Sequence, residues 1–154
     1  MIPFIVLLAS TLLFRVIGAA GVGPFHSWIW SLRGGLALMF LFTASAHWGK
    51  RRGDLIAMVP RALPRPELMV SITGIFEVLG AVGILIPATA HVAAACLAIL
   101  LIALFPANVR AAQEHLTIGG RQATSLPLRT LLQLVFLGAV LVSGFPGALP
   151  FVAR

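Results

Sequence analysis

The sequence predicts an all-α membrane protein, built as a bundle of five transmembrane helices. The first observation behind this prediction is the composition: 60% of the 154 residues are hydrophobic and only 10% are charged, whereas an average soluble domain carries about 25% charged residues. A chain of this length still exposes roughly 30% of its unfolded surface after folding, so the apolar excess must face lipid. The other two observations are the lengths of the apolar segments and the distribution of Lys and Arg between them.

Five segments are apolar over most of the roughly 20 residues that a helix needs to cross the ~30 Å hydrocarbon core of a bilayer. The third and fourth segments are separated only by a short connection around Pro87, which predicts an antiparallel helical hairpin. We expect the whole chain to form a single membrane domain. The predicted spans are residues 3–20, 28–47, 67–86, 89–106 and 127–145.

Residues 48–66 are expected to form a loop in the membrane interface. Asp54 can cap a short amphipathic turn over residues 55–59, and the prolines that follow prevent the turn from continuing as a helix. Trp48 beside Lys50 is typical of an aromatic anchor at the level of the lipid headgroups.

The basic residues alternate between the connections. Residues 21–27 and 87–90 contain no Lys or Arg, whereas residues 48–66 contain five and residues 107–126 contain two. The positive-inside rule then predicts a multi-pass protein of the cell membrane with a cytoplasmic amino terminus and an external carboxy terminus. The net charge of +7 is therefore a topology signal, and no nucleic-acid partner is expected.

The first span could instead be a signal peptide, with Gly18-Ala19-Ala20 as a small-residue cleavage site. The chain lacks a basic segment before the apolar run, and Arg15 interrupts that run, so the pattern favours a retained helix. Either alternative leaves the orientation of the other four spans unchanged.

Three ionisable residues, Arg15, Arg33 and Glu77, fall at membrane depth, where such side chains are costly and either pair or serve function. Helical spacing puts Glu77 on a stripe of small residues that faces the bundle interior. We expect Arg33 to reach Glu77 and form an ion pair. The pair would either fix the helix register or line a polar pocket for a ligand or a proton. Arg15 would suit an anionic or quinone-carbonyl ligand, or would extend to the headgroups.

A second polar group is predicted at the cytoplasmic helix ends, where His47, Asn108 and Gln133 would lie with Glu67 and Arg129. A histidine near a carboxylate can shuttle protons. The alternative is that the amides bond backbone or lipid headgroups. One His and one carboxylate supply too few ligands for a metal site, and the single cysteine excludes an intramolecular disulfide.

Four motifs in residues 35–133 resemble DoxX-like membrane proteins. In chain order they read FTASAHW at residues 42–48, MVP at 58–60, TGIFEVLGAVGILIP at 73–87 and FPANV at 105–109. The resemblance implies a four-helix membrane bundle, here with an additional first helix, and carries Glu77, His47 and Asn108 over as site residues. Trp48 departs from the pattern, because Phe is common there, and so does the extra helix.

The resemblance implies one class of function and leaves another open. DoxX-like proteins include small subunits of membrane-associated oxidoreductase systems, such as the thiosulfate:quinone oxidoreductase type, and relatives that act as cargo receptors or assembly chaperones. The first hypothesis is a subunit of a quinone-linked oxidoreductase system, with no intrinsic cofactor, a quinone as ligand and a partner subunit that supplies the redox centre. The alternative is a non-catalytic module that binds a partner protein or a lipid. A small transporter is disfavoured by the absence of an inverted repeat.

Overall fold

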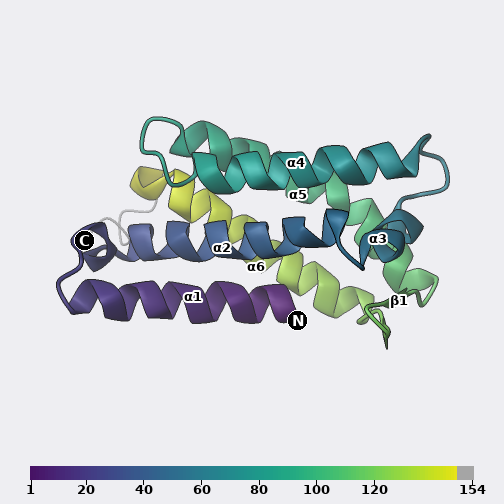
Figure 1. The fold of residues 1–154 in the computed structure, drawn as a ribbon, viewed down its shortest axis with the longest axis horizontal. Helices are drawn as coiled ribbons and strands as arrows, with labels where there is room; N and C mark the ends of the chain where they lie inside the picture. The colour runs from purple at the N-terminus through teal and green to yellow at the C-terminus, as the bar shows by residue number, and fades with distance from the viewer. Residues whose placement is uncertain (149–154) are drawn as a thin grey trace.

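The computed structural model describes residues 1–148 and contains five long helices packed side by side (Figure 1). All five are long and apolar enough to cross a membrane. The all-α prediction is thereby confirmed. The long helices are α1 (Ile2–Ala19), α2 (Trp28–Trp48), α4 (Pro66–Gly83), α5 (Ala90–Gln113) and α6 (Leu126–Gly144), and the short elements are η1 (Gly23–His26), α3 (Arg52–Met58), β1 (Thr117–Ile118), β2 (Arg121–Gln122) and η2 (Pro146–Ala148).

Helix α2 is the central helix and contacts α1, α4 and α6, while α5 packs against α4 and α6. Leu36 and Met39 of α2 are buried against Leu97 of α5 and Val140 of α6. The large side chains on the outward faces of α1, α4, α5 and α6 remain exposed. In a bilayer these faces contact the lipid acyl chains, where exposed apolar side chains carry no cost of hydration.

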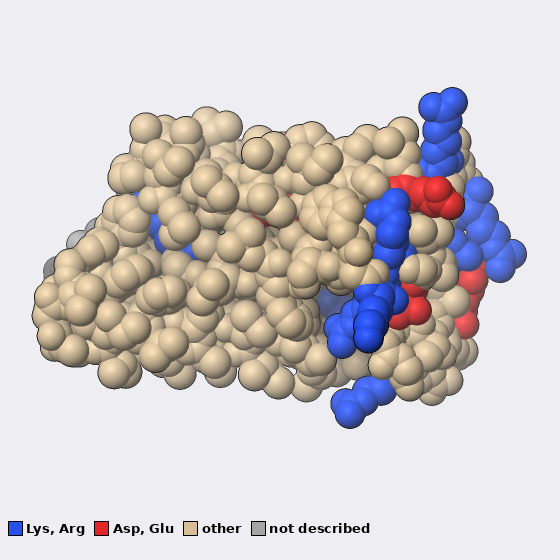
Figure 2. Space-filling model, in the orientation of Figure 1, with Lys and Arg blue, Asp and Glu red and all other residues tan. Residues whose placement is uncertain are grey.

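The two ends of the bundle differ in charge. The connections that hold α3 and the β1–β2 hairpin lie at one end, and the connections after α1 and α4 lie at the other (Figure 1). Figure 2 shows that Lys and Arg side chains gather at the end of α3 and the hairpin, which we call the basic end, while most of the remaining face is uncharged. The connections that are rich in Lys and Arg therefore lie together at one end of the bundle, and those without Lys or Arg lie at the other end.

Helix α5 differs from the predicted fourth span. It contains Pro106 within the helix and ends only at Gln113, seven residues later. A proline removes one backbone hydrogen bond, and in membrane helices neighbouring side chains can satisfy the freed groups. The carbonyl that Pro106 leaves without a donor is that of Ile102, four residues earlier. Gln133 Nε2 donates to the neighbouring carbonyl of Leu101. Helix α4, in contrast, ends at Gly83 rather than at residue 86.

Asp54 does not cap the interfacial turn as predicted. It lies inside the first turn of α3, whose N-cap residue is Arg51. Its Oδ2 accepts a hydrogen bond of 2.8 Å from the backbone N–H of Gly119, because the β1–β2 hairpin contacts α3. This contact between the two basic connections could not be read from local spacing.

Replacing Gly35 by Ala is expected to disrupt the packing of α1 on α2. A Cβ at Gly35 would lie 3.1 Å from both the carbonyl oxygen of Leu7 and the Cβ of Thr11, and would overlap the Thr11 hydroxyl. We expect the free energy of unfolding to fall by about 1–3 kcal/mol, measured by thermal unfolding in detergent with tryptophan fluorescence. Gly138→Ala in α6 is the matched control, because nothing lies within 4 Å of that position. An equal loss at both positions would contradict this packing.

Candidate functional site

Glu77 and His47 face each other between α4 and α2, and each residue is 6% exposed. The close approach of the two helices depends on Gly74, which lies one turn before Glu77. A Cβ at Gly74 would lie 2.7 Å from Cγ of His47 and 2.9 Å from Cη2 of Trp48, both too close for any other residue. The small-residue stripe therefore turns Glu77 inward as predicted and also makes room for the imidazole.

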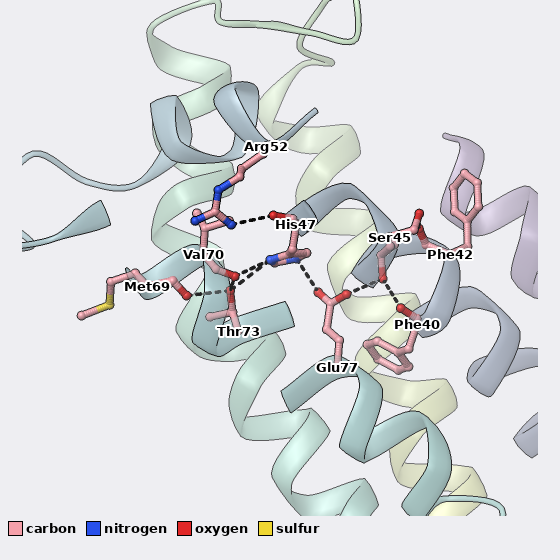
Figure 3. Close-up of polar contacts among 10 residues, drawn as sticks. Phe40, Phe42, Ser45, His47, Arg52, Met69, Val70, Thr73 and Glu77 are labelled. Atoms are coloured by element: carbon pink, nitrogen blue, oxygen red, sulfur yellow. Dashed lines mark hydrogen bonds and ion pairs between the residues drawn. The ribbon is translucent and has the colours of Figure 1, made fainter. Parts of the chain in front are cut away.

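Two side chains of α2 meet the Glu77 carboxylate. His47 Nε2 lies 3.5 Å from Oε1, and the Thr43 hydroxyl donates a 2.7 Å hydrogen bond to Oε2. Thr43 and His47 are four residues apart and so share one face of the helix. The polar contacts around the pair are drawn in Figure 3. Both carboxylate oxygens thus have a polar partner in an otherwise apolar interior, which is the condition for burying such a group.

The other nitrogen of His47 fixes which atom can exchange a proton. Nδ1 lies 2.5 Å from the backbone carbonyl oxygen of Val70 (Figure 3). A carbonyl oxygen only accepts hydrogen bonds, so Nδ1 carries a hydrogen and donates it. Nε2, which faces Glu77, is then the nitrogen that gains or loses a proton. One proton can therefore be held on either side of the contact between His47 and Glu77.

Arg52 connects this pair to the basic end. Its Nη1 donates to the backbone carbonyl of His47 at 2.7 Å, and its Nη2 donates to Ser71 Oγ at 3.0 Å and to the carbonyl of Glu67 at 3.1 Å. Thr73 Oγ1 lies 3.5 Å from His47 Nδ1. The Glu67 side chain is exposed and contributes only its backbone. Hydroxyl and guanidinium groups therefore continue from the buried pair toward the surface.

The predicted pairing of Arg33 with Glu77 is wrong. Arg33 is buried, but its Nε donates to the backbone carbonyl of Ser143 at 3.0 Å, and its guanidinium carbon lies 5.3 Å from the ring centroid of Trp30. The residue opposite Glu77 is Thr43, ten positions further along α2, which is about 15 Å of helix. Which residue of α2 lies opposite Glu77 depends on how far the two helices are shifted along each other, and counting residues from the helix ends does not give that shift.

Arg15 lies at the same end of the bundle as Arg33. Its guanidinium carbon is 5.1 Å from the ring centroid of Trp28, a geometry in which the aromatic face stabilises the cation. Its buried Nε has no hydrogen-bond partner within residues 1–148. Neither arginine contributes to the site around Glu77.

Asn108 and Gln133 form a separate group between α5 and α6. Asn108 Oδ1 accepts a 2.7 Å hydrogen bond from Nη1 of Arg129, and Gln133 Nε2 donates to the carbonyl of Leu101 at 2.5 Å. The structure thus divides the predicted cytoplasmic cluster into two sites, because His47 lies on the α4 side of the central helix and these residues lie on the α6 side.

The site has the groups of an acid–base pair and too few ligands for a metal. In the part of the chain that the structure describes, no three His, Cys, Asp or Glu side chains are placed to hold a metal ion. Sequence reasoning named His47 and Glu77 but missed Thr43 and Arg52. The spacing of Thr43 from His47 was a usable signal, whereas Arg52 reaches His47 only through the turn at residues 49–51.

The fold and the buried pair define a small five-helix membrane protein with an acid and a base in contact in its interior. The chain belongs to the family described as Domain of unknown function (DUF8561), whose family model matches residues 36–143. The matched region begins within α2 and ends near the end of α6, so it includes His47 and Glu77, and α1 precedes it. Comparison with curated proteins and with solved structures gave no match.

Thr43→Val retains the shape of the side chain and removes the hydroxyl that bonds Glu77. Because a buried carboxylate oxygen then lacks its donor, we expect the free energy of unfolding to fall by about 1–3 kcal/mol, measured by denaturant titration in detergent. Ser45→Ala, on the exposed side of α2, should change it by less than about 0.5 kcal/mol. A Thr43 variant as stable as the wild type would show that Glu77 has no need of this donor.

Proposed function

We propose that this chain is a small membrane subunit of a quinone-linked oxidoreductase system, in which His47 and Glu77 handle protons. The observation that carries the proposal is the 3.5 Å contact between the imidazole and the carboxylate, whose side chains are each 8% exposed. Ionisable groups are costly among apolar helices and are typical of proton paths and ligand sites in membrane proteins. A purely structural helix contact has no need of two titratable groups.

The chemistry of quinones fits this pair. Reduction of a quinone to a quinol consumes two electrons and two protons, and the quinone is dissolved in the lipid that surrounds these helices. His47 holds one exchangeable proton at Nε2, and Glu77 is the adjacent acceptor or donor. In this proposal the electrons come from a redox centre in a partner subunit, because residues 1–148 bring together no group of three His, Cys, Asp or Glu side chains that could ligate one.

Three further observations support this assignment. Thr43 and His47 place a hydroxyl and a ring nitrogen on one face of α2, and these are the kinds of group that bind a quinone carbonyl. Ser71 and Thr73 place hydroxyl groups between the pair and the basic end, where protons could enter. The motifs that resemble DoxX-like proteins contain both His47 and Glu77, and they favour membership of an oxidoreductase-associated group.

We propose that the basic end is cytoplasmic. Seven of the Lys and Arg residues lie in residues 48–66 and 107–126, which form the connections and the last turns of α5 at that end, and none lies in the connections 21–27 and 87–90. The positive-inside rule places such an end in the cytoplasm. The amino terminus is then cytoplasmic, and the chain after α6 is external.

A second candidate function is a non-catalytic module that binds or assembles a membrane partner. It is favoured by the completeness of the contacts around the pair, since both carboxylate oxygens and both ring nitrogens have neighbours within the chain. It is also favoured by the exposed apolar face of α6, which includes Leu131, Leu134 and Val135. In this alternative, Glu77 and His47 fix the register of α2 on α4.

Purification in native lipids tests the first function directly. The protein is extracted with its surrounding membrane in polymer nanodiscs, its lipids are assayed for quinone, and its partners are identified by mass spectrometry. The proposal predicts enrichment of quinone over the bulk membrane and recovery of a redox-active subunit. Recovery of neither would overturn it.

Glu77→Gln and His47→Gln should each lower the quinone reductase activity of the assembled complex by at least about 100-fold, the usual contribution of a general acid or base. Glu114→Gln is the matched control, because Glu114 is an exposed acid outside the membrane-spanning helices. Partner recovery is measured in parallel. Loss of activity with the partner retained supports proton handling, whereas loss of the partner supports the assembly module, and unchanged activity contradicts the proposal.

A further inference from the structure

A half-buried arginine without a carboxylate partner lies between α5 and α6. Arg129 Nε donates to the carbonyl of Thr124 at 3.2 Å, and Nη1 donates to Asn108 Oδ1 at 2.7 Å. Nη2 makes no hydrogen bond to any residue of the described range 1–148. Two of the three guanidinium nitrogens are therefore fixed, and the third presents its N–H groups in a defined direction.

The charge of Arg129 is not balanced within the described chain. The ion pairs of residues 1–148 join His47 to Glu77 and join Glu114 to Arg61 and Arg110. The hydrogen bond and charge of Arg110 hold the pKa of Glu114 below its usual value, so that carboxylate already serves another arginine. The Asn108 amide accepts a hydrogen bond but carries no charge. A cation taken partly out of water in this way favours an anionic ligand.

The depth of Arg129 indicates where this anion comes from. Arg129 is three residues after Leu126, the first residue of α6, which is about 5 Å along the helix. It is at the basic end, where the membrane surface lies close to the helix termini. Lipid phosphates occupy this level, between the hydrocarbon core and the water.

The surface over this part of α6 is hollowed. Helix α1 stops short of the basic end, so it does not cover the stretch of the bundle between its amino-terminal end and the basic end (Figure 1). Figure 2 shows a depression there, beside the amino-terminal end of α1, with Lys or Arg atoms at its floor. Arg129 is the single Lys or Arg of α6. A ligand can therefore approach this helix from the lipid side.

We propose that Arg129, held in place by Asn108 and the carbonyl of Thr124, binds the phosphate group of an anionic membrane lipid. A guanidinium donates parallel N–H groups to phosphate oxygens and is the side chain best suited to that geometry. The bound headgroup neutralises the arginine, and the acyl chains fill the uncovered stretch beside α1. This site is separate from the His47–Glu77 pair and does not depend on the quinone-linked function.

The test is native mass spectrometry of the full chain in detergent, titrated with phosphatidylglycerol or with zwitterionic phosphatidylcholine. We expect the wild type to bind phosphatidylglycerol about fivefold more tightly, which is the effect of one arginine near an anionic surface. Arg129→Gln should abolish this preference. Arg121→Gln, which removes an exposed arginine at the same end, should retain it. A preference unchanged in Arg129→Gln would overturn the proposal.

Two further experiments test whether Arg129→Gln loses the preference only because it misfolds, and whether the bound phosphate comes from solution instead of from a lipid. Asn108→Asp leaves Arg129 in place and gives it a carboxylate, so the variant should remain folded and lose the preference; a retained preference would contradict the proposal. Inorganic phosphate at millimolar concentration should not displace phosphatidylglycerol from the wild type. Displacement would show that the ligand is a soluble phosphate and would overturn the lipid assignment.

Discussion

A carboxylate buried among lipid-facing helices needs polar partners there. The partners of Glu77 determine how α2 packs against α4 at the centre of this protein. The two side chains that contact the carboxylate, the hydrogen-bond donor Thr43 and the imidazole of His47, come from one face of α2. They reach Glu77 because Gly74 allows the helices to approach until the imidazole lies against the α4 backbone. The register of α2 on α4 is therefore a consequence of one acid and the glycine one turn before it.

Three other buried or half-buried charges, those of Arg33, Arg15 and Arg129, are accommodated without carboxylates. Arg33 uses a carbonyl and the Trp30 ring, Arg15 uses the Trp28 ring, and Arg129 uses a carbonyl and an amide. These guanidinium groups stay charged under all ordinary conditions. Glu77 instead lies against His47, an imidazole that exists in a neutral and a protonated form, and this pairing is the basis of the proton-handling role that we propose.

Some of this arrangement could be predicted from the sequence and some could not. The long helices follow from runs of apolar residues, which are local, and the inward direction of Glu77 follows from the small residues on its face. The partner of Glu77 depends on how far α2 and α4 are shifted along each other, which local spacing does not give, and Arg33 was therefore expected where the structure has Thr43 and His47. The continuation of α5 through Pro106 to Gln113 was also missed, because a proline within an apolar segment is locally a signal for the end of a helix.

The most direct test of this account is the nitrogen-15 NMR spectrum of histidine-labelled protein in lipid bilayers, with His47 assigned by its loss in His47→Gln. The account predicts that Nδ1 is protonated because it donates to the Val70 carbonyl, and that the Nε2 resonance shifts in Glu77→Gln because the proton of that nitrogen is shared with the carboxylate. An unprotonated Nδ1, or an Nε2 resonance unchanged by Glu77→Gln, would contradict it.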